Sequence, residues 1–213
     1  MNIFDAIRNG DSAAAAQLLD ADPSLASARQ NQISPLLFAT YLGRADIVRL
    51  LLDRGAPVSF AEACAIGDAG LALRLLDADP SLLDQRSEDG FPPLGLAIFF
   101  RHPDLARTLI ERGADVNAAA ENRQRVRPLH AAASVGDLET MRLLLERGAD
   151  PNTRQELDFT PLHGAAARGD VEMARLLLAH GAGREPKSSD GKSPADVARE
   201  HGKEAFLAFL ASQ

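Results

Sequence analysis

The first residues that could do chemistry are two histidines, His130 and His163, which lie 33 residues apart. Imidazole nitrogens bind zinc or act as general bases, and a helical metal site places a second ligand three or four residues from the first. Neither histidine has a Cys, His, Asp or Glu at those spacings. Both occupy the same place in a repeated Pro-Leu-His segment, so we predict a copied structural role and no bound metal.

Three further segments are weak candidates for a reactive site. Gly191-Lys-Ser193 is similar to the end of a phosphate-binding loop, but that loop needs a glycine five residues earlier, where Pro186 stands. Cys64 takes a position that alanine holds in other copies of the repeat, which predicts an inert buried thiol. Glu200 and His201 are neighbours that point about 100° apart on a helix. We therefore expect no enzyme active site, no metal and no cofactor.

The composition is that of a folded, acidic, soluble protein. The chain has 213 residues, of which 46% are apolar and 25% charged, and its formal net charge is −7. This charge gives no general attraction to nucleic acid or to an anionic membrane. Aromatic residues make up only 5% of the chain and tryptophan is absent, so leucine and alanine must form the core, which favours helices.

Several features favour a reducing, cytoplasmic location. A single cysteine cannot form an intrachain disulfide. The N-terminal residues include Asp5 and Asp11 and lack the basic and apolar regions of an export signal, and no apolar run approaches membrane-spanning length. Arginine outnumbers lysine by 20 to three, which we attribute to the base composition of a bacterial genome.

A repeat of about 33 residues runs along the whole chain. A typical copy has a proline, a glycine eight residues later and a leucine pair 16 and 17 residues after the proline. The anchors are Pro35, Pro93, Pro128, Pro161 and Pro194, with degenerate copies anchored at Asn2 and Ser59. We predict a single domain, 1–213, made of seven copies at about 1–28, 29–56, 57–86, 87–121, 122–154, 155–187 and 188–213.

Each copy predicts two helices and a projecting loop. Serine or threonine before the proline caps a short inner helix, and the glycine ends it. The outer helix, for example residues 138–147, has leucines at helical spacing and stops at Gly148-Ala-Asp150. We call the loop that leads to the next inner helix a finger. Because neither helix can bury its apolar side alone, the copies must stack, and we predict an all-α solenoid.

Residues 158–170 (Asp-Phe-Thr-Pro-Leu-His-Gly-Ala-Ala-Ala-Arg-Gly-Asp) and 176–182 (Leu-Leu-Leu-Ala-His-Gly-Ala) resemble the ankyrin repeat consensus. The resemblance covers residues 1–213, although copies one and three end their outer helices with Asp-Ala-Asp-Pro-Ser-Leu. It implies an ankyrin-repeat solenoid of about seven helix-turn-helix repeats with hairpin loops. It also implies that the two histidines hydrogen-bond to the backbone to tie adjacent copies, and that the chain binds another protein without catalysis.

One interval in the repeat is short. Pro35 and Ser59 are 24 residues apart, whereas the other anchors are 33 to 35 apart. About nine residues are missing, and in the ankyrin family these residues would form a finger. We predict a gap in the row of fingers between copies two and three.

The resemblance also indicates which side chains contact a partner, namely the pair before the inner-helix glycine and the finger residues before the proline. Carried to this chain, the candidates are Tyr41, Leu42, Ile66, Phe99 and Phe100 on inner helices, and Phe91, Phe159, Arg123 and Arg125 in fingers. Burying a phenylalanine is worth about 1.5–3 kcal/mol, which makes the first five a candidate apolar stripe. Each candidate also has a purely structural alternative to partner contact. Phe100 could pack sideways on the neighbouring helix, Phe91 and Phe159 could pack one finger onto the next, and the arginines could simply be solvated.

We predict a monomer that binds an apolar segment of another protein while Arg123 and Arg125 select an acidic flank. We expect no nucleic acid or membrane partner. One alternative is a ligand-binding or enzymatic pocket at the missing finger near Ile66, where Cys64 and Glu62 are the nearest reactive groups. Another alternative is self-association through the same apolar stripe.

Overall fold

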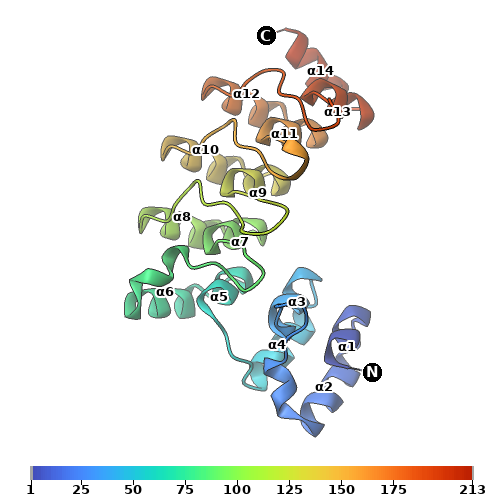
Figure 1. Cartoon of the computed structure of the whole chain (residues 1–213), viewed down its shortest axis with the longest axis vertical. Helices are drawn as coiled ribbons and strands as arrows, with labels where there is room; N and C mark the ends of the chain where they lie inside the picture. The colour runs from blue at the N-terminus through green and yellow to red at the C-terminus, as the bar shows by residue number, and fades with distance from the viewer. Residues whose placement is uncertain (1, 213) are drawn as a thin grey trace.

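The computed structural model describes residues 2–212, which fold into a curved stack of paired helices (Figure 1). The inner helices are α1 (Ile3–Asn9), α3 (Pro35–Tyr41), α5 (Phe60–Ile66), α7 (Pro93–Phe99), α9 (Pro128–Val135), α11 (Pro161–Arg168) and α13 (Pro194–Glu200). The outer helices are α2 (Ser12–Ala21), α4 (Ala45–Asp53), α6 (Ala69–Ala78), α8 (Pro103–Glu111), α10 (Leu138–Glu146), α12 (Val171–Ala179) and α14 (Glu204–Ala211). The predicted all-α solenoid is confirmed.

The helix ends follow local sequence signals. Ser34 caps α3, since its Oγ accepts a hydrogen bond of 3.0 Å from the Leu37 amide, and Pro35 occupies the first helical position. Copies without that proline start one residue after a capping side chain, Asn2 for α1 and Ser59 for α5. In copies one and three, short 3-10 helices, η1 (Pro23–Ser27) and η2 (Pro80–Asp84), follow the outer helix, because proline cannot continue it.

Neighbouring fingers are joined by backbone hydrogen bonds. The Glu121 amide donates to the Gly90 carbonyl at 2.8 Å, and the Glu156 amide donates to the Gln124 carbonyl at 2.8 Å. The Ser189 amide donates to the Leu157 carbonyl at 2.9 Å, next to the short turn η3 (Glu156–Asp158). The four fingers between α6 and α13 therefore form a continuous row.

The predicted missing finger is confirmed, because α4 ends at Asp53 and α5 begins at Phe60 with no hairpin between them. Figure 1 shows an extended link here, and the first two copies set apart from the column formed by the others. Side-chain hydrogen bonds cross the gap between flanking elements, among them one from the Ser34 hydroxyl to Glu62. Arg29 donates to Glu88 at 2.6 Å, and the Tyr41 hydroxyl donates to Asp89 at 2.7 Å.

The hydrophobic core is divided at the same place. One cluster of buried side chains belongs to copies one and two, from Ile3 to Ala56, and a larger one runs from Phe60 to Phe209. Between them lies a small cluster, which we call the bridging cluster: Leu37, Ala61, Ala65 and Leu96, with Ile33, Tyr41, Phe91 and Phe100 packed against it. The bridging cluster is therefore the main apolar contact between copies one and two and the rest of the stack.

Within residues 2–212, no helix combines the length and the hydropathy needed to cross a bilayer.

Candidate partner-binding groove

A groove of about 560 Å³ lies between the inner helices and the fingers, and residues at three repeated positions supply much of its wall. Counted from the proline of each copy, the residues two before it are Ile33, Phe91, Val126 and Phe159. The residues three after it are Leu96, Ala131 and Gly164, and the residues six after it are Tyr41, Phe99 and Ser134. The 33-residue repeat therefore builds the groove by bringing equivalent positions into register.

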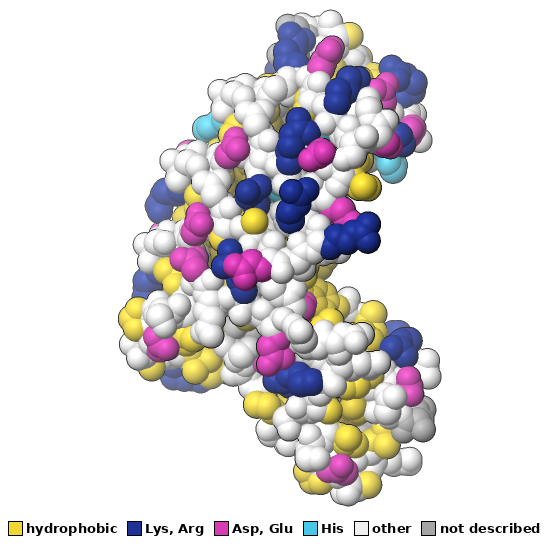
Figure 2. All heavy atoms as spheres, in the orientation of Figure 1, with side chains coloured by type: hydrophobic (Ala, Val, Ile, Leu, Met, Phe, Trp, Pro, Cys, Tyr) yellow, Lys and Arg dark blue, Asp and Glu magenta, His cyan; other side chains and the backbone are white. Residues whose placement is uncertain are grey.

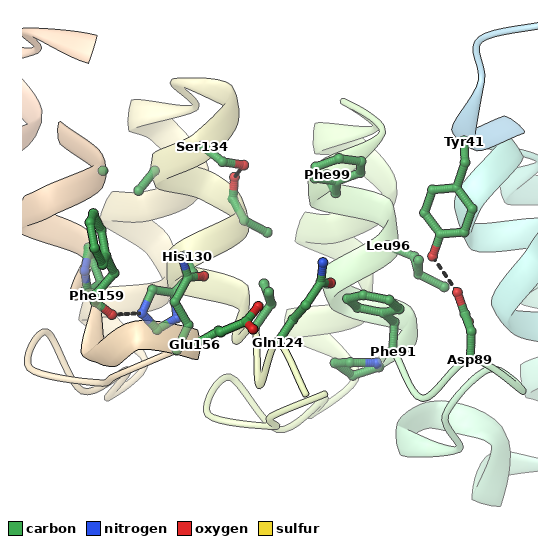
Figure 3. Close-up of a pocket in the computed structure, with 18 of the residues that line it drawn as sticks. Tyr41, Asp89, Phe91, Leu96, Phe99, Gln124, His130, Ser134, Glu156 and Phe159 are labelled. Atoms are coloured by element: carbon green, nitrogen blue, oxygen red, sulfur yellow. Dashed lines mark hydrogen bonds between the residues drawn. The ribbon is translucent and has the colours of Figure 1, made fainter. Parts of the chain in front are cut away.

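The groove is not uniform along its length. At the repeated helix positions, large side chains, Tyr41, Leu96 and Phe99, line the end contributed by α3 and α7, and the smaller Ala131, Ser134 and Gly164 line it at α9 and α11. His130 and Phe159 also line this second end (Figure 3). At the second end Gly164 is closely packed, because a Cβ there would lie 3.1 Å from the Ala133 Cβ. We call the end lined by Tyr41, Phe91 and Phe99 the aromatic end of the groove.

Four of the candidate residues lie together in this groove: Tyr41, Phe91, Phe99 and Phe159. Phe99 is the most accessible of them, with 47% of its surface exposed. Phe159 also stacks against His163, with ring centroids 4.8 Å apart, so it supports the finger as well as lining the groove. Helix α7 supplies Phe99 and the finger before it supplies Phe91, and Figure 3 shows both rings in the same part of the groove.

The other apolar candidates lie outside the groove lining. Phe100 is half-buried and packs sideways, with its ring centroid 5.3 Å from that of Tyr41 and 5.2 Å from that of Phe99. Ile66 is half-buried against the core of the first two copies. Leu42 is 40% exposed just after α3. Figure 2 shows the molecule indented on one side where the first two copies meet the rest, with hydrophobic side chains beside the indentation.

The two candidate arginines lie in the finger that precedes α9. The side chain of Arg123 is 89% exposed and its Nε lies 2.7 Å from the Glu156 carboxylate in the next finger. Arg125 is exposed at the turn of the finger, where its φ of 51° places it in the left-handed region. The arginines therefore stand beside the groove, and they do not line it.

Two groove residues were missed by the sequence analysis although a signal for them existed. Ile33 and Val126 stand two residues before a proline, as Phe91 and Phe159 do. The position two residues before the proline is therefore apolar in four copies, whether or not the side chain is aromatic. Asp89 was also missed, although Asp190 stands at the same place in copy seven, four residues before the proline and followed by a glycine.

Burial sets the protonation of the titratable groups in the groove. Burial and the neighbouring Asp89 carboxylate raise the pKa of the Tyr41 hydroxyl well above its usual value, so it remains a hydrogen-bond donor. Burial lowers the pKa of His130 to about 4, which leaves its imidazole neutral at pH 7. The charged side chains of the lining are thus the carboxylates of Asp89 and Glu156.

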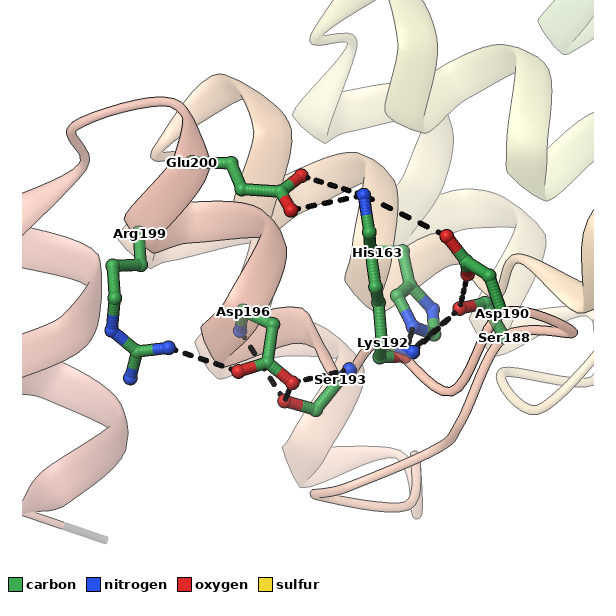
Figure 4. A network of polar contacts seen from close by, with 8 residues as sticks. All are labelled: His163, Ser188, Asp190, Lys192, Ser193, Asp196, Arg199 and Glu200. Atoms are coloured by element: carbon green, nitrogen blue, oxygen red, sulfur yellow. Dashed lines mark hydrogen bonds and ion pairs between the residues drawn. The ribbon is translucent and has the colours of Figure 1, made fainter.

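The segment Gly191-Lys-Ser193 forms a turn and a helix cap, as predicted. Gly191 has a φ of 80°, and Ser193 Oγ accepts from the Asp196 amide at the start of α13. Hydrogen bonds from Ser193 and Arg199 hold the pKa of Asp196 well below its usual range. Lys192 Nζ lies 2.9 Å from Glu200 and 3.6 Å from Asp190, and Figure 4 shows it between these two carboxylates.

The missing finger leaves a separate hollow of about 380 Å³. Glu62 lines it, but Cys64 and Ile66 do not. The Glu62 carboxylate accepts hydrogen bonds from the Ser34 hydroxyl and from the Ser59 amide, which completes the cap of α5. Among residues 2–212, no three His, Cys, Asp or Glu side chains gather closely enough to hold a metal ion.

Comparison with known families agrees with this architecture. A family model described as ankyrin repeats, in three copies, matches residues 3–120, 60–155 and 129–213. These matches together cover nearly all of the chain, so the chain belongs to the ankyrin repeat family. Ankyrin repeats are in general protein–protein interaction modules and are typically non-catalytic.

Curated relatives share the repeat and are longer than this chain. The human ankyrin repeat and KH domain-containing protein 1 is 33% identical over 126 residues, which are 59% of this chain and 4% of that protein. An ankyrin repeat-containing protein of Treponema pallidum is 37% identical over 109 residues, 49% of this chain and 35% of its own. The human ankyrin repeat, SAM and basic leucine zipper domain-containing protein 1 is 35% identical over 118 residues, 53% of this chain and 24% of its own.

Proposed function

We propose that this chain is a non-catalytic module that holds an apolar segment of another protein in the groove. The observation that supports this most directly is the apolar lining by Tyr41, Phe91, Phe99 and Phe159. Phe99 leaves 47% of its surface in water, where it contributes nothing to stability. Covering such a side chain with a partner is worth about 1.5–3 kcal/mol.

Preorganisation is the proposed mechanism of binding. Short inner helices form one wall, and fingers held to one another by backbone hydrogen bonds form the other. Both walls exist before the partner arrives, so little ordering entropy is lost when it docks.

Residues outside the lining complete the proposed surface. Leu42, exposed just after α3, extends the apolar contact beyond the aromatic end. Phe100 and Ile66 contribute by packing behind the exposed residues, since both are half-buried. Arg123 and Arg125 stand beside the groove and select an acidic flank of the bound segment through charge-assisted hydrogen bonds.

The proposed function is tested by comparing how tightly the wild type and two variants bind partner proteins. The wild-type chain, Phe99→Ala and Leu52→Ala are each used to capture proteins from the source cells, and affinity is then measured for each captured protein. Leu52 is 38% exposed on the outer helix α4 and serves as the matched apolar control. We expect Phe99→Ala to weaken partner binding about 10- to 100-fold and Leu52→Ala to leave it unchanged. Equal affinities of wild type and Phe99→Ala would contradict the proposal.

We also propose that the chain acts as a monomer in the cytoplasm. Sedimentation at two concentrations separates a monomer from self-association through the apolar stripe. A mass that rises with concentration in the wild type, but not in Phe99→Ala, would assign the groove to a second copy.

A further inference from the structure

The groove carries a specific pattern of charge in addition to its apolar lining. Asp89 and Glu156 are its charged lining residues, and neither lysine nor arginine contributes to the lining. The whole chain has a formal net charge of −7, which also favours approach of a cationic group.

The two carboxylates differ in how they are compensated. Glu156 forms an ion pair with Arg123 at 2.7 Å. Among the described residues, the Asp89 carboxylate accepts hydrogen bonds only from neutral hydroxyls, that of Tyr41 at 2.7 Å and that of Ser87 at 2.5 Å. Within residues 2–212, none of the ion pairs includes Asp89. Its negative charge at the edge of the groove is therefore not neutralised by the protein.

Aromatic rings line the groove at the same end as this carboxylate. The centroids of Tyr41 and Phe91 are 6.4 Å apart, and Tyr41 binds Asp89 directly. Figure 3 shows Tyr41, Asp89, Phe91 and Phe99 at the same end of the groove. Ring faces attract cations through their quadrupole, and a nearby carboxylate adds direct attraction. A guanidinium or ammonium group on an aliphatic stem matches both features, because the stem packs on the rings and the head meets the carboxylate.

We propose that the aromatic end of the groove, formed by Tyr41, Asp89, Phe91 and Phe99, binds a cationic side chain, arginine or lysine, of the partner segment. This inference rests on the proposed function, because it specifies the chemistry of the segment in the groove. Arg123 and Arg125 stand farther along the row of fingers, beside the other part of the groove. A bound segment with a basic residue at one end and an acidic flank at the other is thereby held in one direction.

Tyr41 is a convenient reporter because it is the only tyrosine of the chain. The protein is labelled with carbon-13 tyrosine, and the ring signals of Tyr41 are followed by NMR during titration. The probes are three acetylated and amidated tripeptides, Leu-Arg-Leu, Leu-citrulline-Leu and Leu-Glu-Leu. Citrulline has nearly the shape of arginine but no charge. We expect saturable shifts with Leu-Arg-Leu, about tenfold weaker binding of the citrulline peptide and still weaker binding of the glutamate peptide.

Two charge-removing variants assign the preference to Asp89. Asp89→Asn should bind both the arginine and the citrulline peptide with the affinity that the wild type has for the citrulline peptide. Glu121→Gln removes one carboxylate from the next finger, where Glu121 pairs with Arg86 outside the groove lining, and should keep the tenfold preference. Retained affinity for the citrulline peptide shows that Asp89→Asn is still folded.

Three results would overturn the inference: equal affinity of the wild type for the arginine and citrulline peptides, a preference that survives in Asp89→Asn, or no shift of the Tyr41 signals with any peptide. The proposed function is judged separately by the effect of Phe99→Ala on partner binding. Equal binding of all three peptides would leave the apolar groove as a docking site and remove only its charge selectivity.

Discussion

His130 and His163 each use both ring nitrogens to connect two copies of the repeat. In each, Nδ1 accepts from the amide at the start of its own inner helix, that of Arg127 at 3.4 Å and that of Thr160 at 3.1 Å. Nε2 then donates to a carbonyl in the next finger, that of Phe159 or Lys192, both at 3.1 Å. The structural role implied by the ankyrin resemblance is confirmed.

These contacts require neutral imidazoles and predict a pH dependence of stability. Burial lowers the pKa of His130 to about 4, against about 6.5 in an unfolded chain. Between these values the unfolded state binds the extra proton, so the free energy of unfolding falls as the pH drops from about 6.5 to about 4. We expect His130 to contribute about 2–3 kcal/mol to this loss.

Urea denaturation at pH 7.5 and pH 4.5 measures the effect. The difference between the two pH values should be smaller in His130→Gln than in the wild type, with the exposed His180→Gln as the control for loss of an imidazole. An unchanged difference in His130→Gln would show that His130 binds its proton equally in both states.

Single residues also show the limits of what the sequence reveals. Phe91 and Phe159 could be placed because they stand at a fixed distance from a helix-starting proline. The choice between Phe99 and Phe100 could not be made, because consecutive residues at a helix end point in different directions and Arg101 replaces the usual glycine. The contact of Asp89 with Tyr41 could not be found because the two residues lie 48 positions apart in the sequence, across the missing finger.

Among the elements, α7 ends in an unusual way. Arg101 follows this helix with a φ of 63°, whereas Gly10, Gly43, Gly136 and Gly169 take the same place in other copies. The left-handed conformation costs about 1 kcal/mol or more in a residue with a side chain and is nearly free for glycine. The Arg101 side chain is exposed, so no buried contact offsets this cost.

We therefore expect Arg101→Gly to raise the free energy of unfolding by about 1 kcal/mol, since relief of strain exceeds the added entropy of the unfolded chain. Gly43→Ala is the matched control, because a Cβ at Gly43 would have nothing within 4 Å and the effect of φ is isolated. It should lower stability by about 1 kcal/mol. Chemical denaturation measures both, and a loss of stability in Arg101→Gly would refute the strain argument.

Most elements were predictable because their signals are local. Prolines preceded by a capping residue fixed the starts of α3, α11 and α13, and Ser59 fixed that of α5. The sequence also showed that one finger is absent, because that is a matter of counting residues. It did not show that Arg29 and Glu88 would meet across the gap, since this contact depends on how the flanking copies settle in three dimensions.

At the scale of the whole molecule, a stacked protein gains stability from contacts between neighbouring copies. The missing finger weakens one of these interfaces. It removes the backbone hydrogen bonds that join fingers elsewhere, and the core on either side belongs to separate clusters joined through the small bridging cluster. The groove crosses this junction, because Ile33 and Tyr41 come from the first part and the rest of its lining from the second.

The first two copies should therefore open without the others. Native-state hydrogen exchange is expected to give amides in α1 to α4 an opening free energy about 1–2 kcal/mol below that of amides in α9 to α11. Tyr41→Phe removes the hydrogen bond to Asp89 and should widen this difference in opening free energy. Insertion of a copy of finger residues 183–191 between Pro57 and Val58 should narrow the difference, because it restores the row of fingers. If α1 to α4 and α9 to α11 open with the same free energy in all three proteins, the stack unfolds as one cooperative unit despite its divided core.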